Sequence, residues 1–226
     1  MLSIDKLELR YPNGTGVGPV SLEVPDGSVY AIIGPNGAGK TTLFSVLSGI
    51  ANPTGGTWRL GSADPATLPR RDVGYLPEKS FFFPRFTPRQ FFSFDATMRD
   101  IDHVPESVRR DLVAFGCEPF LDEEMGELSQ GMAKRVALAC AFSGSPRLVL
   151  LDEPLNAIDI QTTILLKAKV VEAAERGAVV LISSHILDFV DKVADEVIFL
   201  NHGLLDSSID PKARGTEEEY RKRFID

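Results

Sequence analysis

Residues 34–41 read GPNGAGKT and fit the pattern G-x-x-x-x-G-K-[ST]. They follow a short and almost wholly apolar run, residues 28–34, which is typical of a buried parallel strand. A helix is predicted directly afterwards, over residues 40–47. Because a strand, a glycine-rich loop and a helix in this order are typical of a loop that surrounds phosphate, the segment predicts an α/β protein with a phosphate site at this turn.

The chemistry of this loop suits a polyphosphate. Glycines let backbone N–H groups turn inward around the ligand, and the helix N-terminus adds the positive end of its dipole. Lys40 supplies a cation for the β- and γ-phosphates, and the Thr41 hydroxyl is placed to bind Mg²⁺. The alternative is an ordinary glycine-rich turn with a surface lysine. The predicted nucleotide-binding residues of the loop are Gly34, Pro35, Asn36, Gly37, Ala38, Gly39, Lys40, Thr41 and Thr42.

Two carboxylates follow a second apolar run, in residues 148–153, which read LVLLDE. Four apolar residues predict a buried strand, and ligands bind at the carboxyl end of the strands in a parallel sheet. Asp152 fits as the carboxylate that holds Mg²⁺, directly or through water. Glu153 fits as the base that polarises an attacking water. The alternative, a strand that ends in a solvated acidic turn, is weakened by the phosphate loop upstream.

Composition narrows the class of protein. The chain has 226 residues, enough for a sizeable core, and its net charge of -8 argues against a general nucleic-acid binder. The longest apolar run, residues 136–142, is far shorter than the roughly 20 residues that a membrane-spanning helix needs. The first residues alternate in polarity and predict a strand rather than a signal peptide. Cys117 and Cys140 give no disulfide framework, which fits a reducing, cytoplasmic setting.

The pattern of elements divides the chain into an α/β core and an inserted helical lobe. Strand patterns fall in about residues 1–80 and 145–210, and residues 211–226 form a charged tail. No strand pattern occurs in residues 81–144, where Thr87 before a proline reads as the cap of a helix. The helices predicted in this lobe cover residues 88–99, 105–115 and 130–142.

Several motifs together resemble the ATPase subunit of ABC transporters, and the resemblance extends from about Ile4 to Leu205. It implies one domain over residues 1–226: a P-loop NTPase core, with a RecA-like mixed sheet and an antiparallel β subdomain, plus the helical lobe. It also implies ATP and Mg²⁺ as ligands. The motifs occur in the family's order at residues 34–42, 128–132, 152–154 and 156–159 and at His185.

The resemblance implies further roles. Tyr11 matches the aromatic residue that stacks on adenine, although a tyrosine that ends an edge strand often only packs. His185 matches the histidine that contacts the γ-phosphate and assists catalysis with Glu153 and Lys40. The signature loop, which acts on the partner subunit's ATP, is Leu128, Ser129, Gln130, Gly131 and Met132. The loop that links the two subunits' sites is Asn156, Ala157, Ile158 and Asp159.

The sequence departs from the family pattern at the signature loop and at one metal ligand. Glu78 stands where a glutamine usually offers a neutral oxygen to Mg²⁺, so binding is expected to survive with altered electrostatics. Gln130 and Met132 replace a glycine and a glutamine of the signature. Ser129, which caps the helix and bonds phosphate, and Gly131, which lets the backbone come close, are present. This variant resembles the exporter branch that handles drugs, haem, lipids or polysaccharides.

The resemblance also implies partners. One set of motifs predicts a second ATPase subunit, in a homodimer or a heterodimer, and a separate integral membrane permease. Seven of the 14 phenylalanines lie between Phe81 and Phe94, where they either pack the helical lobe or receive a permease helix. The expected location is the cytoplasmic face of the membrane, through the permease. The alternatives are an ABC ATPase without a permease, of the iron–sulfur, translation or repair type, and a nonhydrolytic regulatory module. No nucleic acid is expected.

Overall fold

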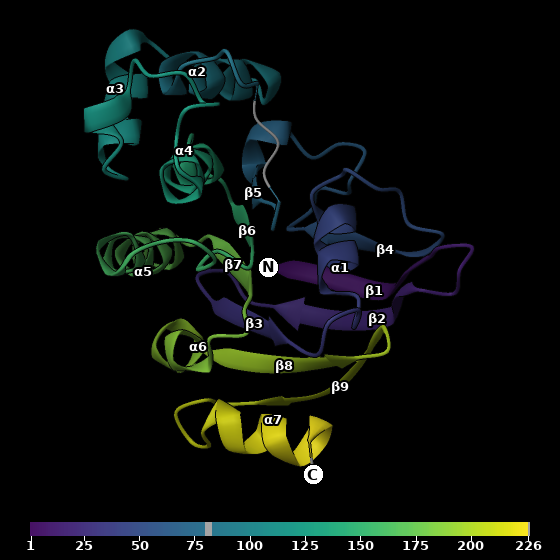
Figure 1. Cartoon of the computed structure of the whole chain (residues 1–226). Helices are drawn as coiled ribbons and strands as arrows, with labels where there is room; N and C mark the ends of the chain where they lie inside the picture. Colours follow the sequence, from purple (N-terminus) through teal and green to yellow (C-terminus); the bar gives the residue numbers. More distant parts are fainter. Residues whose placement is uncertain (80–82, 226) are drawn as a thin grey trace.

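The structure is a computed structural model that describes residues 1–79 and 83–225. The chain forms two β-sheets with helices between and around them (Figure 1). In Figure 1 the helices of residues 88–142 form the upper part of the molecule, and the C-terminal helix lies at its lower end. Phe81 and Phe82 lie outside the described residues.

The larger sheet has six strands in the order β5-β6-β7-β3-β8-β9. The strands from β5 to β8 are parallel, and β9 runs antiparallel to β8. Their bounds are β5 Val73–Leu76, β6 Leu148–Asp152, β7 Val179–Ser183, β3 Val29–Ile33, β8 Glu196–Asn201 and β9 Leu204–Ile209. All residues of β3, β6 and β7 are buried, as expected for central parallel strands covered on both faces.

The smaller sheet is antiparallel and has the order β2-β1-β4, with β2 Gly16–Val24, β1 Leu2–Arg10 and β4 Gly55–Leu60. The helix α1 (Lys40–Leu47) lies between the two sheets, because Leu43, Phe44 and Leu47 share one apolar cluster with residues of β1, β3 and β6. The strand β1 pairs on both sides, with β2 and with β4. The expectation that Tyr11 ends an edge strand is therefore wrong: β4, a distant segment, occupies the second edge of β1.

The helical lobe contains α2 (Pro88–Met98), α3 (Pro105–Val113) and α4 (Gln130–Phe142). The Thr87 side chain accepts a hydrogen bond from the Gln90 amide, and the Gln90 side chain accepts one from the Thr87 amide, which fixes the start of α2. Apolar residues of α2 and α4 share one core cluster with Leu76 and Val149 of the sheet. The lobe is thus packed firmly on the parallel strands.

The remaining helices are α5 (Ile160–Glu175), α6 (Leu187–Val193) and α7 (Thr216–Phe224), with short 3-10 turns η1 (Arg70–Asp72) and η2 (Glu118–Phe120). Within the described residues no helix is long and apolar enough to span a membrane. Cys117 and Cys140 are both buried, and burial raises the pKa of the Cys117 thiol to about 12. The predicted fold class, an α/β core with an antiparallel β subdomain and an inserted helical lobe, is confirmed.

Candidate functional site

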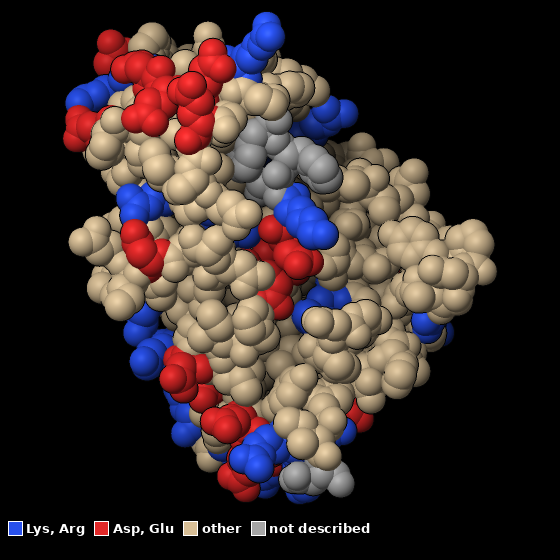
Figure 2. Space-filling model, viewed as in Figure 1, with Lys and Arg blue, Asp and Glu red and all other residues tan. Residues whose placement is uncertain are grey.

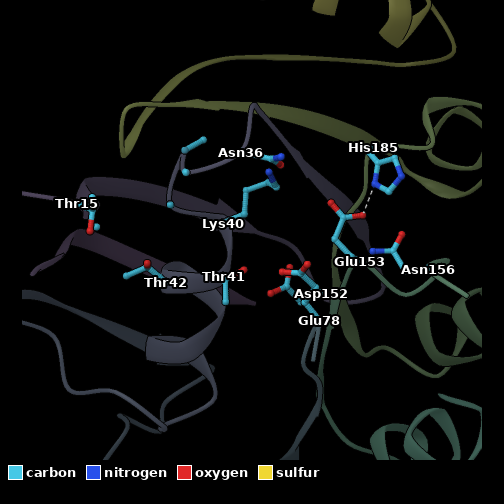
Figure 3. A pocket seen from close by; sticks show the side chains of 14 residues that line it. Thr15, Asn36, Lys40, Thr41, Thr42, Glu78, Asp152, Glu153, Asn156 and His185 are labelled. Carbon is cyan, nitrogen blue, oxygen red and sulfur yellow. Dashed lines mark hydrogen bonds and ion pairs between the residues drawn. The ribbon is translucent and has the colours of Figure 1, made fainter. Parts of the chain in front are cut away.

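A cavity of about 750 Å³ lies where the phosphate loop meets the carboxyl ends of the parallel strands (Figure 3). It is lined by Thr15, Gly16, Asn36, Gly37, Ala38, Gly39, Lys40, Thr41, Thr42, Glu78, Asp152, Glu153, Asn156 and His185. Figure 2 shows acidic atoms gathered in a hollow on this face, with basic atoms at its edge. The structure therefore brings most of the predicted nucleotide, metal and catalytic residues into one site.

The phosphate loop depends on glycine for its shape. Gly39 has φ +105°, and a Cβ at this position would lie 2.6 Å from the main-chain oxygen of Gly16. Gly39 also gives the first turn of α1 no side-chain cap, so the helix N-terminus is left for a ligand. A larger residue here would force β2 away from the loop.

The side chain of Lys40 lies over the loop that precedes it. Its Nζ donates hydrogen bonds to the main-chain oxygens of Gly34, at 2.8 Å, and of Pro35, at 3.2 Å. These contacts hold the ammonium at the edge of the cavity, where Figure 3 shows it facing the space between the loop and the strand ends. The lysine that the sequence singles out is thus placed to meet an anion.

Asp152 ends β6 and is fully buried. Its Oδ1 accepts a hydrogen bond from the Ser183 hydroxyl, whereas its Oδ2 has no hydrogen-bond partner among the described residues. A buried carboxylate oxygen without a donor is costly unless a cation meets it. The donor set therefore fits Mg²⁺, with the Thr41 hydroxyl and the Glu78 carboxylate on the same cavity.

The described residues contain no group of three or more His, Cys, Asp or Glu side chains that could hold a metal by themselves. Mg²⁺ is commonly bound through one or two carboxylates together with phosphate oxygens and water.

Glu153 has an unusual backbone. Its φ of +48° lies in the left-handed region, which non-glycine residues rarely adopt. Its amide donates to Ser183, at 3.1 Å to the main-chain oxygen and 3.0 Å to the hydroxyl. Its Oε2 lies 2.8 Å from Nδ1 of His185 (Figure 3). The strained turn points the carboxylate into the cavity beside the predicted histidine, a pairing that the sequence did not predict.

Four of the five signature residues, Ser129, Gln130, Gly131 and Met132, line a separate cavity of about 370 Å³. Ser129 caps α4 by accepting a hydrogen bond from the Met132 amide at 3.2 Å. A Cβ on Gly131 would lie 2.7 Å from the main-chain oxygen of Ala157, so this glycine permits a close approach within the same chain. The guanidinium of Arg135 pairs with the carboxylate of Asp159 at 2.5 Å. The structure thus joins the predicted signature loop to the predicted linking loop.

The signature cavity and the phosphate cavity share no lining residue among those described. The loop after Glu153 connects them, because Asn156 lines the phosphate cavity and Ala157 lines the other. Leu128 and Ile158 instead pack against the core cluster that contains the helical lobe. Within one chain, the signature residues therefore lie outside the space that Lys40 faces.

Lys134 was not singled out by the sequence analysis. It is only 6% exposed, and its Nζ donates to the main-chain oxygen of Glu78 at 3.5 Å. Burial lowers the pKa of this lysine, and the charges of Asp152, Glu78 and Glu153 oppose that shift. The available signal was a lysine two residues before the apolar stretch of a helix, four residues after the predicted helix start.

Tyr11 and the phenylalanine segment have mixed outcomes. Tyr11 is 43% exposed and does not line the phosphate cavity, where Thr15 and Gly16 from the same turn lie instead. Its role at adenine stays a prediction. Phe92 is buried in the core, as the packing interpretation requires. Phe83 and Phe94 remain exposed, with ring centroids 5.2 Å apart.

Comparisons with known proteins give one family. The family model described as "ABC transporter" matches residues 17–156. The chain is 32% identical over 205 residues to an uncharacterized ABC transporter ATP-binding protein, YxlF of Bacillus subtilis (strain 168), covering 90% of this chain and 68% of that protein. It is 29% identical to the SkfA peptide export ATP-binding protein SkfE of the same organism, covering 100% of this chain and 95% of that protein. A solved ATP binding subunit of an ABC transporter superposes with a TM-score of 0.85 at 26% identity, covering 97% of this chain and 94% of that one.

Proposed function

Because this chain belongs to the ABC transporter family, we propose that it is the subunit that binds and hydrolyses ATP to drive transport through a separate permease. The observation that carries the proposal is the phosphate cavity itself. One cavity contains the phosphate loop with Lys40, the buried Asp152 with an unpartnered oxygen, and the Glu153 carboxylate. These are the groups that phosphate binding, metal binding and activation of water require.

ATP binds with its phosphates in the loop of residues 34–42. Lys40 exchanges its main-chain partners for the β- and γ-phosphates, which offer it full negative charge. The amides at the start of α1 donate to the same phosphates. Tyr11 stacks on adenine, and its exposed ring is free to do so.

The Thr41 hydroxyl and the carboxylates of Asp152 and Glu78 would hold Mg²⁺. When bound, the ion neutralises part of the charge on the phosphates. The unpartnered Oδ2 of Asp152 supports this assignment, since the oxygen lacks a donor among the described residues. Ser183 holds the other oxygen of the same carboxylate, which fixes its orientation.

Glu153 acts as the general base. Its carboxylate accepts a proton from the water whose oxygen attacks the γ-phosphorus, and the bond between that phosphorus and the leaving ADP oxygen breaks. His185 lies 2.8 Å from this carboxylate and keeps it oriented toward the cavity. The His185 side chain is 65% exposed, so its other ring nitrogen is accessible to a ligand. The same imidazole contacts the γ-phosphate through that nitrogen.

A second ATPase subunit completes the site. The signature residues of one chain lie outside its own phosphate cavity, so Ser129 and Gly131 act on ATP that the partner subunit holds. The partner is a second copy or a close relative. The helix that Ser129 caps then presents its N-terminus to the phosphates across the interface.

The permease docks beside the helical lobe, near the exposed rings of Phe83 and Phe94. A second cavity, of about 630 Å³, lies between α1, β5 and α2. The exposed side chains of Ile50 and Met98 line it, which gives an apolar rim for a helix of the permease.

Export is the direction favoured by the likeness to SkfE, whose name assigns that relative to peptide export. The protein then sits on the cytoplasmic face of the membrane.

The test is the Glu153→Gln variant. It is expected to bind ATP as the wild type does and to hydrolyse it about 10²–10⁴-fold more slowly, because the amide cannot take the proton. Phosphate release measures turnover, and a nucleotide titration measures binding. Hydrolysis at the wild-type rate would place the base elsewhere. Purification of the chain from membranes, with a polytopic protein bound, separates the transporter from an ABC ATPase without a permease.

A further inference from the structure

The turn between β8 and β9 lies next to the phosphate cavity. Asn201 pairs with Leu204 across it, so His202 and Gly203 alone form the turn. Both have positive φ, +47° and +81°, as a two-residue type I′ turn requires. Glycine adopts such angles freely, and histidine adopts them more often than most residues. The sequence therefore suits a tight hairpin with a fixed tip, which lies beside β2 (Figure 1).

Gly203 is hydrogen-bonded to two segments that contribute to the cavity. Its amide donates to the main-chain oxygen of Ala38, in the phosphate loop, at 2.9 Å. Its own main-chain oxygen accepts from the amide of Gly18, in β2, at 2.7 Å. Both distances are those of well-formed hydrogen bonds. One residue of the turn thus joins the phosphate loop to β2.

These two segments supply two walls of the cavity. The phosphate loop, residues 34–42, supplies one. Thr15 and Gly16 supply the other, which we call the base wall because Tyr11, assigned to adenine, precedes it in the same turn. Gly203 also packs against the base wall, since a Cβ on it would lie 2.8 Å from the main-chain oxygen of Gly16. A side chain at position 203 would therefore push the base wall away from the turn.

We propose that Gly203 is a positioning residue that sets the distance between the phosphate loop and the base wall, and thereby how tightly the site holds a ligand that contacts both. The inference rests on the proposed function, since it concerns the same nucleotide. ATP contacts both walls at once, whereas inorganic triphosphate contacts the phosphate loop alone. A displaced base wall therefore weakens the binding of ATP and leaves the binding of triphosphate nearly unchanged. A residue that only stabilised the fold would affect both ligands equally.

The Gly203→Ala variant tests the contact with the base wall directly. It places a Cβ against the main-chain oxygen of Gly16, and it also strains the backbone, because alanine is disfavoured at a φ of +81°. Gly177→Ala is the matched control. Gly177 has φ +90°, and apart from its own chain neighbours no described residue comes within 4 Å of its Cβ position. The control therefore shares the backbone strain and lacks the clash.

A second pair of variants changes the turn without a clash. His202 is exposed and has a φ of +47°. The His202→Val variant introduces a β-branched residue, for which positive φ is unfavourable, whereas His202→Asn introduces a residue that tolerates it. The valine variant should loosen the turn and the asparagine variant should keep it.

The experiment measures the affinity of the full chain for a nonhydrolysable ATP analogue by titration with Mg²⁺ present, and for inorganic triphosphate by competition with that analogue. Gly203→Ala should weaken the binding of the analogue about tenfold and that of triphosphate less than about twofold. His202→Val should weaken the binding of the analogue about threefold. Gly177→Ala and His202→Asn should keep the wild-type affinity for both ligands.

The outcomes separate this inference from the proposed function. If the wild type does not bind the analogue, or if triphosphate does not compete for its site, the proposed phosphate site itself fails. If the wild type binds both, equal losses for the two ligands in Gly203→Ala, or no loss, overturn the inference. A selective loss in Gly177→Ala of the same size would also overturn it, because backbone strain alone would then explain the effect. If Gly203→Ala does not fold, the His202 pair decides: equal affinity of the two variants for the analogue would refute a role of the turn.

Discussion

Replacement of Ser183 by alanine tests how the two acidic residues are held. Ser183 ends β7 and is fully buried, and its hydroxyl serves both carboxylate-bearing residues. It donates to Oδ1 of Asp152 and accepts from the Glu153 amide at 3.0 Å. Since Oδ2 of Asp152 already lacks a partner among the described residues, the Ser183→Ala variant would leave the whole buried carboxylate without a donor.

The expected cost follows from these contacts. Loss of a hydrogen bond to a charged group costs about 1.5–3 kcal/mol, and a buried charge left unsatisfied adds to this. The Glu153 amide keeps its second bond, to the main-chain oxygen of Ser183, so its contribution is below about 1 kcal/mol. The Ser183→Ala variant should therefore lose about 2–4 kcal/mol of the free energy of unfolding.

The assay is urea unfolding without metal or nucleotide, with Ser184→Ala as the matched control. Ser184 is also buried, but among the described residues its hydroxyl has one hydrogen-bond partner, the Ile186 amide at 3.0 Å, so its loss should cost about 1 kcal/mol. A difference between the two variants of less than about 0.5 kcal/mol would refute the claim that Asp152 depends on Ser183. Magnesium with nucleotide should narrow the difference, since a bound cation compensates the carboxylate.

Three further substitutions test the other parts of the site. Lys40→Ala should abolish tight binding of Mg-ATP, because the phosphates lose their cation; unchanged affinity in a titration would remove Lys40 from the phosphate site. Tyr11→Ala should weaken the binding of ATP by about 1–3 kcal/mol and leave the binding of free triphosphate unaffected, because only adenine stacks. Equal losses of affinity for both ligands would show that Tyr11 only packs. Ser129→Arg should bind ATP normally as a monomer and fail to hydrolyse it, since a bulky cation blocks the approach of the partner's phosphates; full turnover would contradict a site shared between subunits.

Local physical chemistry made much of the fold predictable from the sequence. The structure begins and ends α4 at the predicted residues, because Ser129 caps it and an apolar stretch follows. The run before the phosphate loop was also predictable, because its side chains are apolar on both faces, as a buried parallel strand requires. The two short 3-10 turns were not predicted, because a three-residue turn leaves no periodicity to detect.

Contacts between distant segments could not be predicted in this way. The pairing of Glu153 with His185, and the approach of Gly131 to Ala157, join residues that are far apart in the chain. β1 is a middle strand because β4 pairs with its second edge. The sequence of β1 does not indicate this pairing. Lys134 was overlooked for the same reason, since the main-chain oxygen that its Nζ contacts belongs to Glu78, which lies 56 positions earlier in the chain.

The end of β7 explains how one short segment can organise two different chemical tasks. Ser183 holds the carboxylate of Asp152, which is assigned to the metal, and the amide of Glu153, which is assigned as the base. Two residues later His185 contacts the Glu153 side chain. Glu153 has a φ of +48°, and Ser183 on the neighbouring strand β7 holds it there. The hydrogen bonds to Ser183 therefore offset the backbone strain of Glu153. A substitution that loosens Ser183 should therefore weaken the metal site and misplace the base together, whereas Glu153→Gln should affect only the base.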